Sequence, residues 1–148
     1  MAKDDILDLE AFLPYRLNRL ADTISRDFAR IYRDRHGLTR PEWRTLATLG
    51  QFGTMTATAI GDHSAMHKTK VSRAVAALEK RQWLRREADA GDRRVEHLTL
   101  TKAGAAAYRE LVPLMKAHEA EVLERAAPQE RQSVLRALAL LERTLRPA

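Results

Sequence analysis

The chain has 148 residues, a length that suits one domain with extensions and that is enough to bury a sizeable core. It contains no cysteine, which excludes a disulfide framework, a thiol redox switch and a thiolate zinc site. The formal net charge is +6, and residues 67–102 hold ten Lys or Arg against five Asp or Glu. A basic excess gathered in one segment favours a nucleic-acid partner for that segment.

No apolar run approaches the roughly 20 residues that a membrane helix needs. The first twelve residues are acidic and lack the apolar core of a signal peptide. We therefore expect a soluble, cytoplasmic protein.

The first part of the chain predicts two helices. Apolar residues at helical spacing predict a long helix over residues 9–33. Thr39 and Glu42 have the spacing of a capping box, so a second helix is predicted over residues 39–49. Residues 50–53 contain two glycines and are predicted to form a loop.

The central part predicts a helix, a turn, a second helix and a hairpin. Thr56 is a suitable N-cap for a short helix over residues 56–60, and the second helix is predicted over residues 67–81. A hairpin over residues 83–100, with its turn at residues 88–92, follows. This order of elements is typical of a unit that binds duplex DNA, with one helix in the major groove and the hairpin along the backbone or minor groove. The second helix has an inner stripe of Val71, Val75 and Leu78 and an outer side of Lys68, Thr69, Lys70, Ser72 and Arg73.

The last part predicts a helix over residues 102–125 and another from Pro128 onward. The final helix carries an apolar stripe of leucines and Val134 with no later element to cover it. Packing within the monomer is one explanation, but a symmetric dimer is favoured because that stripe must be buried. The predicted fold is mainly α, a winged helix-turn-helix with long flanking dimerisation helices and a two-stranded β-wing. Its parts are an N-terminal dimerisation helix (1–35), the DNA-binding domain (36–101) and C-terminal dimerisation helices (102–148).

With these elements in order, the chain resembles the MarR family of winged-helix regulators over nearly its whole length. Five fragments carry the resemblance: residues 40–46, 70–75, 78–80, 89–94 and 100–104. The resemblance implies a homodimer that binds a pseudo-palindromic operator and often releases it when a small molecule binds. The family usually has glycine after the recognition helix, where this chain has Gln82. A non-glycine residue costs energy at positive φ, so we expect a local difference in that turn but the same fold.

The outer side of the recognition helix is the predicted DNA-reading surface, although charged helix faces are often only solvated. Lys68 and Lys70 are expected to contact phosphates, and Thr69 a thymine methyl group. Arg73 is expected to contact a guanine edge or a phosphate, because its guanidinium offers a bidentate fork. The whole predicted set on this helix is His67, Lys68, Thr69, Lys70, Ser72 and Arg73.

The hairpin tip adds Arg93 and Arg94, which the family resemblance assigns to the minor groove or its phosphates. The alternative is a pair of ordinary surface arginines. Asp92 is expected to pair with one of them and to orient it rather than to contact DNA.

An effector pocket is implied by the resemblance, between the dimer helices and the DNA-reading unit. The candidate residues are Tyr15, Arg16, Arg19 and Trp43, a set that suits a small aromatic acid or an acidic thioester. The alternative is core packing for the aromatic residues and solvent exposure for the arginines.

Other functional classes find little support in the sequence. The five histidines are scattered and no thiolate is present, so neither a metal site nor a cofactor is expected. No nucleophile–base pair and no phosphate-cradling glycine loop appears, so an enzyme is not expected. The predicted function is a sequence-specific transcriptional regulator, a ligand-responsive repressor acting as a homodimer. The alternative is a nonspecific architectural DNA-binding protein.

Overall fold

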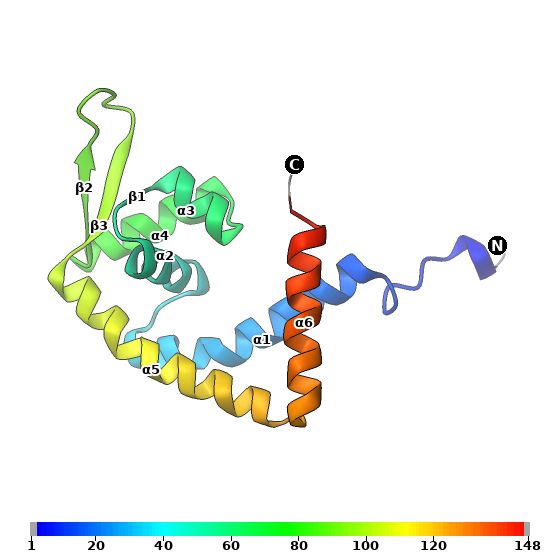
Figure 1. Cartoon of the computed structure of the whole chain (residues 1–148). Coiled ribbons are helices and arrows are strands. Elements are labelled where there is room, and N and C mark those ends of the chain that lie inside the picture. The colour runs from blue at the N-terminus through cyan, green and yellow to red at the C-terminus, as the bar shows by residue number, and fades with distance from the viewer. Residues whose placement is uncertain (1–2, 147–148) are drawn as a thin grey trace. The chain divides into compact units, whose positions relative to one another are not determined.

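The structure, a computed structural model, describes residues 3–146. Over that range it is mainly helical, with six α-helices, a short 3₁₀ helix (Lys3–Asp5) and a small antiparallel sheet, which confirms the predicted fold class. The chain divides into two compact units, residues 1–111 and 112–148, and each is described by itself. Figure 1 shows the order of the elements.

Helix α1 (Leu13–His36) begins four residues and ends three residues later than predicted. Pro14 lies in its first turn, where a missing backbone N–H costs nothing. The helix ends because Gly37 adopts a left-handed conformation, with φ of 65°.

Helix α2 (Arg40–Phe52) has the predicted capping box. The Thr39 N–H donates to Glu42 Oε2 at 2.8 Å, and the Glu42 N–H donates to Thr39 Oγ1 at 3.3 Å. The predicted loop over residues 50–53 is wrong, because the helix continues through Gly50 and stops only at Gly53, where φ is 77°. A Cβ at Gly50 would lie 2.6 Å from ring atoms of Tyr108, so this glycine allows close packing rather than a turn.

Helices α3 (Ala57–Ser64) and α4 (Lys68–Lys80) form the helix-turn-helix. Helix α3 is one turn longer than predicted and ends at Ala65, a non-glycine residue with φ of 55°. The inner side of α4 is buried as predicted, and Ala74 joins the stripe of Val71, Val75 and Leu78. This stripe fixes which side of α4 faces solvent.

The hairpin consists of β2 (Leu84–Ala88) and β3 (Glu96–Leu100), paired antiparallel from Leu84 opposite Leu100 to Ala88 opposite Glu96. A two-residue strand, β1 (Met55–Thr56), pairs with the other edge of β3 and was not predicted. The sheet order is therefore β1-β3-β2. Strand β1 ties the base of the wing to the start of α3.

The junction between α4, the wing and α5 is tightly built. Gln82 adopts the left-handed conformation, with φ of 63°, where the family resemblance places glycine. The Thr101 hydroxyl donates to the Gln82 carbonyl at 2.6 Å, and the Thr101 N–H donates to the Trp83 carbonyl at 2.9 Å. A Cβ at Gly104 would overlap that same Trp83 carbonyl, so only glycine fits at this position.

Helix α5 (Lys102–Glu124) begins in the first unit and continues into the second, past Pro113. Helix α6 (Pro128–Thr144) starts where predicted, at Pro128. None of the described helices combines the length and apolar character needed to cross a membrane.

Candidate nucleic-acid interface

The outer side of α4 presents donors with no partner in the protein. Lys68, Lys70, Ser72 and Arg73 are exposed, and no hydrogen bond or ion pair within residues 3–146 occupies their side chains. The Thr69 side chain is also exposed and has no hydrogen-bond partner within residues 3–146. Because the buried stripe holds the helix from behind, these groups are directed outward and are available to a ligand.

His67 has a structural role that the sequence did not predict. It is the N-cap of α4, and its Nδ1 accepts a hydrogen bond from the Thr69 N–H at 3.2 Å. An accepting Nδ1 leaves the proton of the neutral ring on Nε2. The group that His67 can offer to an anion is therefore the Nε2–H.

The wing tip is organised by two carboxylates. Asp89 Oδ2 accepts the N–H groups of Gly91 and Asp92, each at 3.0 Å, and Asp89 Oδ1 lies 2.8 Å from His97 Nε2. The hydrogen bond with His97 is the largest cause that lowers the pKa of Asp89 below its ordinary value of 3.8, followed by the two backbone N–H groups. The tip is thus closed by charged hydrogen bonds rather than by apolar packing.

Asp92 holds Arg94. Its Oδ1 lies 3.1 Å from Arg94 Nε, its Oδ2 lies 3.3 Å from Arg94 Nη2, and the Arg94 N–H also donates to Oδ1 at 3.0 Å. The side-chain hydrogen bond from Arg94 lowers the pKa of Asp92. The Arg94 side chain is 91% exposed, so its orientation comes from this pair and from nothing that covers it. Arg93 is exposed and has no hydrogen-bond or ion-pair partner among residues 3–146.

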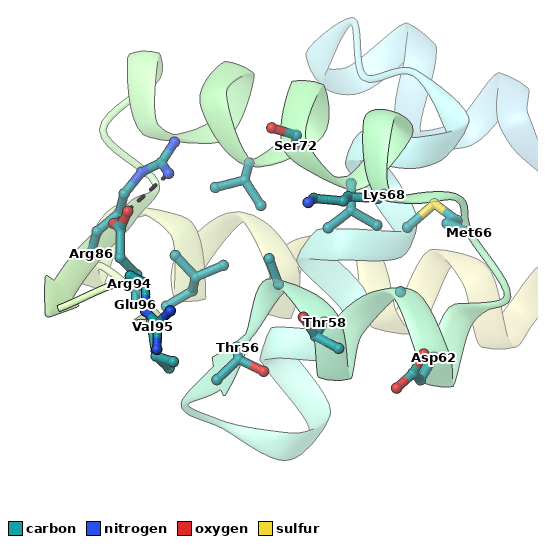
Figure 2. Close-up of a pocket in the computed structure, with 15 residues that line it drawn as sticks. Thr56, Thr58, Asp62, Met66, Lys68, Ser72, Arg86, Arg94, Val95 and Glu96 are labelled. Atoms are coloured by element: carbon teal, nitrogen blue, oxygen red, sulfur yellow. Dashed lines mark ion pairs between the residues drawn. The ribbon is translucent and has the colours of Figure 1, made fainter. Parts of the chain in front are cut away.

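A hollow of about 550 Å³ lies between α3, α4 and the wing (Figure 2). Lys68 and Ser72 line it from α4, Thr58 from α3, and Arg94 from the wing. Arg86 is also part of its wall, where Glu79 of α4 at 3.1 Å and Glu96 of β3 at 3.8 Å hold its guanidinium. The pair with Glu79 joins the wing to the recognition helix, and the pair with Glu96 joins the two strands of the wing. Neither pair was predicted, because which carboxylates meet Arg86 depends on how the hairpin folds against α4.

The four candidate effector residues do not form one cluster. Tyr15, Arg16 and Arg19 are exposed on α1, and the Arg19 guanidinium lies 5.9 Å from the centre of the Tyr15 ring. Trp43 instead stacks on Tyr32, with ring centres 5.6 Å apart. Arg19 alone of the four lines a polar hollow of about 510 Å³ between α1 and α2.

Metal ligands are not gathered anywhere in residues 3–146, where no three His, Asp or Glu side chains lie close enough to hold an ion. His118 lies 3.7 Å from Glu121 on the same helix, which makes a surface pair.

Comparisons with known proteins agree with this geometry. Residues 36–95 match the model of the MarR family. Curated protein sequences gave no match. Among solved structures, the chain is similar to a MarR-family transcriptional regulator from Silicibacter pomeroyi, with 29% identity, a TM-score of 0.74, and 95% of this chain and 94% of that one covered.

Two further structures are informative. Sco3205, a MarR-family regulator from Streptomyces coelicolor solved in complex with DNA, has 25% identity and a TM-score of 0.77, over 97% of this chain and 92% of that one. BpsR from Bordetella bronchiseptica, whose DNA binding is regulated by 6-hydroxynicotinic acid, has 22% identity and a TM-score of 0.77, over 93% and 97%. At that identity BpsR supports the fold alone. Residues 36–95 thus match the MarR family of transcriptional regulators, and nearly the whole chain has the fold of solved MarR-family regulators, one of them bound to DNA.

Proposed function

We propose that the chain is a sequence-specific, ligand-responsive repressor that acts as a homodimer on a pseudo-palindromic operator. The observation that carries the proposal is the outer side of α4, whose donors have no partner within residues 3–146 and stand beside an organised wing. Because such a protein acts on duplex DNA, we place its action in the cytoplasm.

The residues divide into base-reading and backbone-binding groups. Arg73 supplies sequence preference through a guanine edge, and Thr69 contributes through a thymine methyl group. Arg94, oriented by Asp92, enters the minor groove. The backbone-binding residues of the proposed interface are His67, Lys68, Lys70, Ser72 and Arg93.

The test compares Arg73→Ala with Lys70→Ala on a duplex that the protein selects from a random pool and on a scrambled duplex. Arg73→Ala should cost on the order of 1–3 kcal/mol on the selected duplex and reduce the preference for it. Lys70→Ala should weaken binding to both duplexes equally, and it should lower the slope of log affinity against log salt by about 0.9. Anisotropy titrations at several salt concentrations measure both. Wild-type behaviour of both variants would contradict the proposal.

Nonspecific architectural binding is the alternative function, and the basic face of α4 would serve it equally. An excess of unrelated duplex separates the two. Unrelated DNA should fail to displace a specific regulator from the selected duplex, but it should displace a nonspecific binder in proportion to its concentration.

The homodimer is proposed from the flanking helices, residues 1–35 and 102–148. On α6, Val134 and Leu138 are 48% and 47% exposed within one chain, and Leu145, the C-cap residue, is 60% exposed. Exposed leucines at helical spacing favour burial against a second copy. Replacing Leu138 and Leu141 by Asp should yield monomers or insoluble protein, because carboxylates without partners are costly to bury. A monomeric wild-type protein at micromolar concentration in sedimentation would contradict this part.

The proposed effector is a small aromatic acid or an acidic thioester. Its candidate ligands are Tyr15, Arg16, Arg19 and Trp43, of which Arg19 lines the polar hollow between α1 and α2. BpsR, which has the same fold, is regulated by 6-hydroxynicotinic acid, a compound of the first class. In a thermal-shift screen, a ligand of the folded state should raise the melting temperature. Arg16→Ala and Trp43→Ala should each weaken that response more than they weaken operator binding.

A further inference from the structure

A second basic hollow, of about 480 Å³, lies on the α2 side of the recognition helix. Its walls are the first turns of α2 and α4 and the turn that precedes α4. Among residues 3–146 no acidic side chain lines it, and the lining residues are Arg40, Pro41, Arg44, Ala65, Met66, His67 and Lys70. Three fixed positive charges therefore surround a solvent-filled space.

Arg44 is the cation in this hollow that most needs an anion. It is half-buried, and within residues 3–146 its guanidinium has no hydrogen-bond or ion-pair partner. The nearby Tyr32 phenol does not supply a negative charge at neutral pH, because its ordinary pKa is 10.0 and burial raises that pKa further. Arg40 differs, since Asp22 of α1 accepts from its Nη1 at 3.3 Å and from its Nη2 at 3.2 Å. Half-buried cations without counter-charges create a positive potential that favours an anion.

The position of the hollow identifies the anion. A recognition helix in the major groove has a phosphate backbone on each side of it, because the groove is bounded by the two strands. On one side of α4 lies the wing hollow, with Lys68 and Ser72 on its wall. On the other side lies the α2 hollow, to which α4 contributes Lys70 and its N-cap His67.

We propose that the α2 hollow binds a backbone phosphate of the DNA strand opposite the wing, with Arg44 as its principal ligand. Lys70 and the Nε2–H of His67 complete the site. Arg40 contributes to it when its guanidinium leaves the ion pair with Asp22. The inference rests on the proposed DNA reading by α4 and extends the interface to a helix that the sequence did not assign to DNA.

The test uses Arg44→Gln, with Arg109→Gln as control. Arg109 is an exposed arginine of α5 that lines none of these hollows. Arg44→Gln should lower the salt slope by about 0.9 on selected and scrambled duplexes alike, and Arg109→Gln should leave it unchanged. Arg44→Lys keeps the charge and should retain most of the slope. Thermal unfolding of each variant in the absence of DNA checks that the fold is kept.

Single methylphosphonate linkages, each of which removes one phosphate charge, locate the contact. In each half-site, one methylphosphonate linkage should lower the affinity of the wild-type protein. The same linkage should leave the affinity of Arg44→Gln unchanged. If no linkage behaves in this way, or if Arg44→Gln matches Arg109→Gln, the second phosphate site is absent. If Arg73→Ala still removes the operator preference in that case, the proposed function stands without it. Loss of inorganic phosphate binding in Arg44→Gln, with DNA binding unchanged, would overturn the assignment to the DNA backbone.

Asp22→Asn tests the role of Arg40. Freed from the carboxylate, Arg40 should raise DNA affinity severalfold in the wild-type background and add to the salt slope. In an Arg40→Gln background the same substitution should have less effect, because the two residues act as a pair. Equal gains in both backgrounds would show that Asp22 acts only by repelling DNA, which would remove Arg40 from the site.

Discussion

The recognition helix and the wing present their positive charges to DNA in two different states. On α4, Lys68, Lys70 and Arg73 have no partner within residues 3–146 and depend on a buried stripe for their position. In the wing, Arg86 and Arg94 are paired with carboxylates, and Arg93 is the interface arginine without a partner within residues 3–146.

The difference follows from how much core each element has. Helix α4 buries four apolar residues, whereas Leu84 is the only buried residue of β2 and Leu98 the only one of β3. A hairpin with so little apolar contact is ordered by polar bonds, and these use the same charges that face DNA. Substitutions on α4 should therefore act directly on DNA, and substitutions of wing acids should act through the arginines that they hold.

The largest expected effect comes from the base of the wing, which joins both regions to α5. Gly104→Ala places a methyl group on the Trp83 carbonyl, and overpacking of this kind costs about 1–3 kcal/mol. Denaturant unfolding should show this loss. Gly91→Ala is the matched control, because a Cβ there would meet only Asp89 Oδ2 at 3.5 Å. Equal stability of the two variants would show that the backbone at the junction of the wing and α5 shifts at little cost to make room for the methyl group.

A smaller effect is expected from Asp92→Asn, which releases Arg94 from its bidentate partner. Binding to scrambled DNA should strengthen slightly, because a negative charge near the backbone is lost. Preference for A·T-rich flanks should fall severalfold, since a freely rotating Arg94 is not directed into a narrow minor groove. Anisotropy titrations on duplexes that differ only in their flanks measure this. An unchanged preference would mean that the Asp92–Arg94 pair does not orient the wing tip.

The smallest effect concerns pH and the wing tip. Because the pKa of Asp89 is lowered in the folded protein, the stabilisation is present above the ordinary value of 3.8 and is lost as pH falls through the lowered value. The Asp89→Asn variant should therefore be less stable than the wild type at neutral pH, and the stabilities of the two proteins should converge in acid. His97→Gln should bring the pKa of Asp89 closer to 3.8, as measured by carboxyl NMR titration. An Asp89 pKa that is identical in both proteins would contradict the assignment of His97 as the main cause.

Much of the fold could be predicted from local chemistry. The capping box at Thr39, the apolar stripe of α4 and the start of α6 at Pro128 each depend on neighbours within a few residues, so their spacing in the sequence was sufficient. The exposed polar side of α4 follows from the same periodicity. The role of that side on DNA remains a prediction.

Only the tertiary structure decided the features that join distant residues. Gly50 predicts a loop when only its neighbours in the sequence are considered, because the residue that requires a glycine there, Tyr108, lies 58 positions away. Strand β1 was missed because two residues form a strand only when β3 offers an edge. The basic hollow between α2 and α4 has the same origin, since Arg44 and Lys70 show no common period and meet only when the two helices pack. Spacing along the chain reports local periodicity, whereas charges from separate helices form one site only through packing.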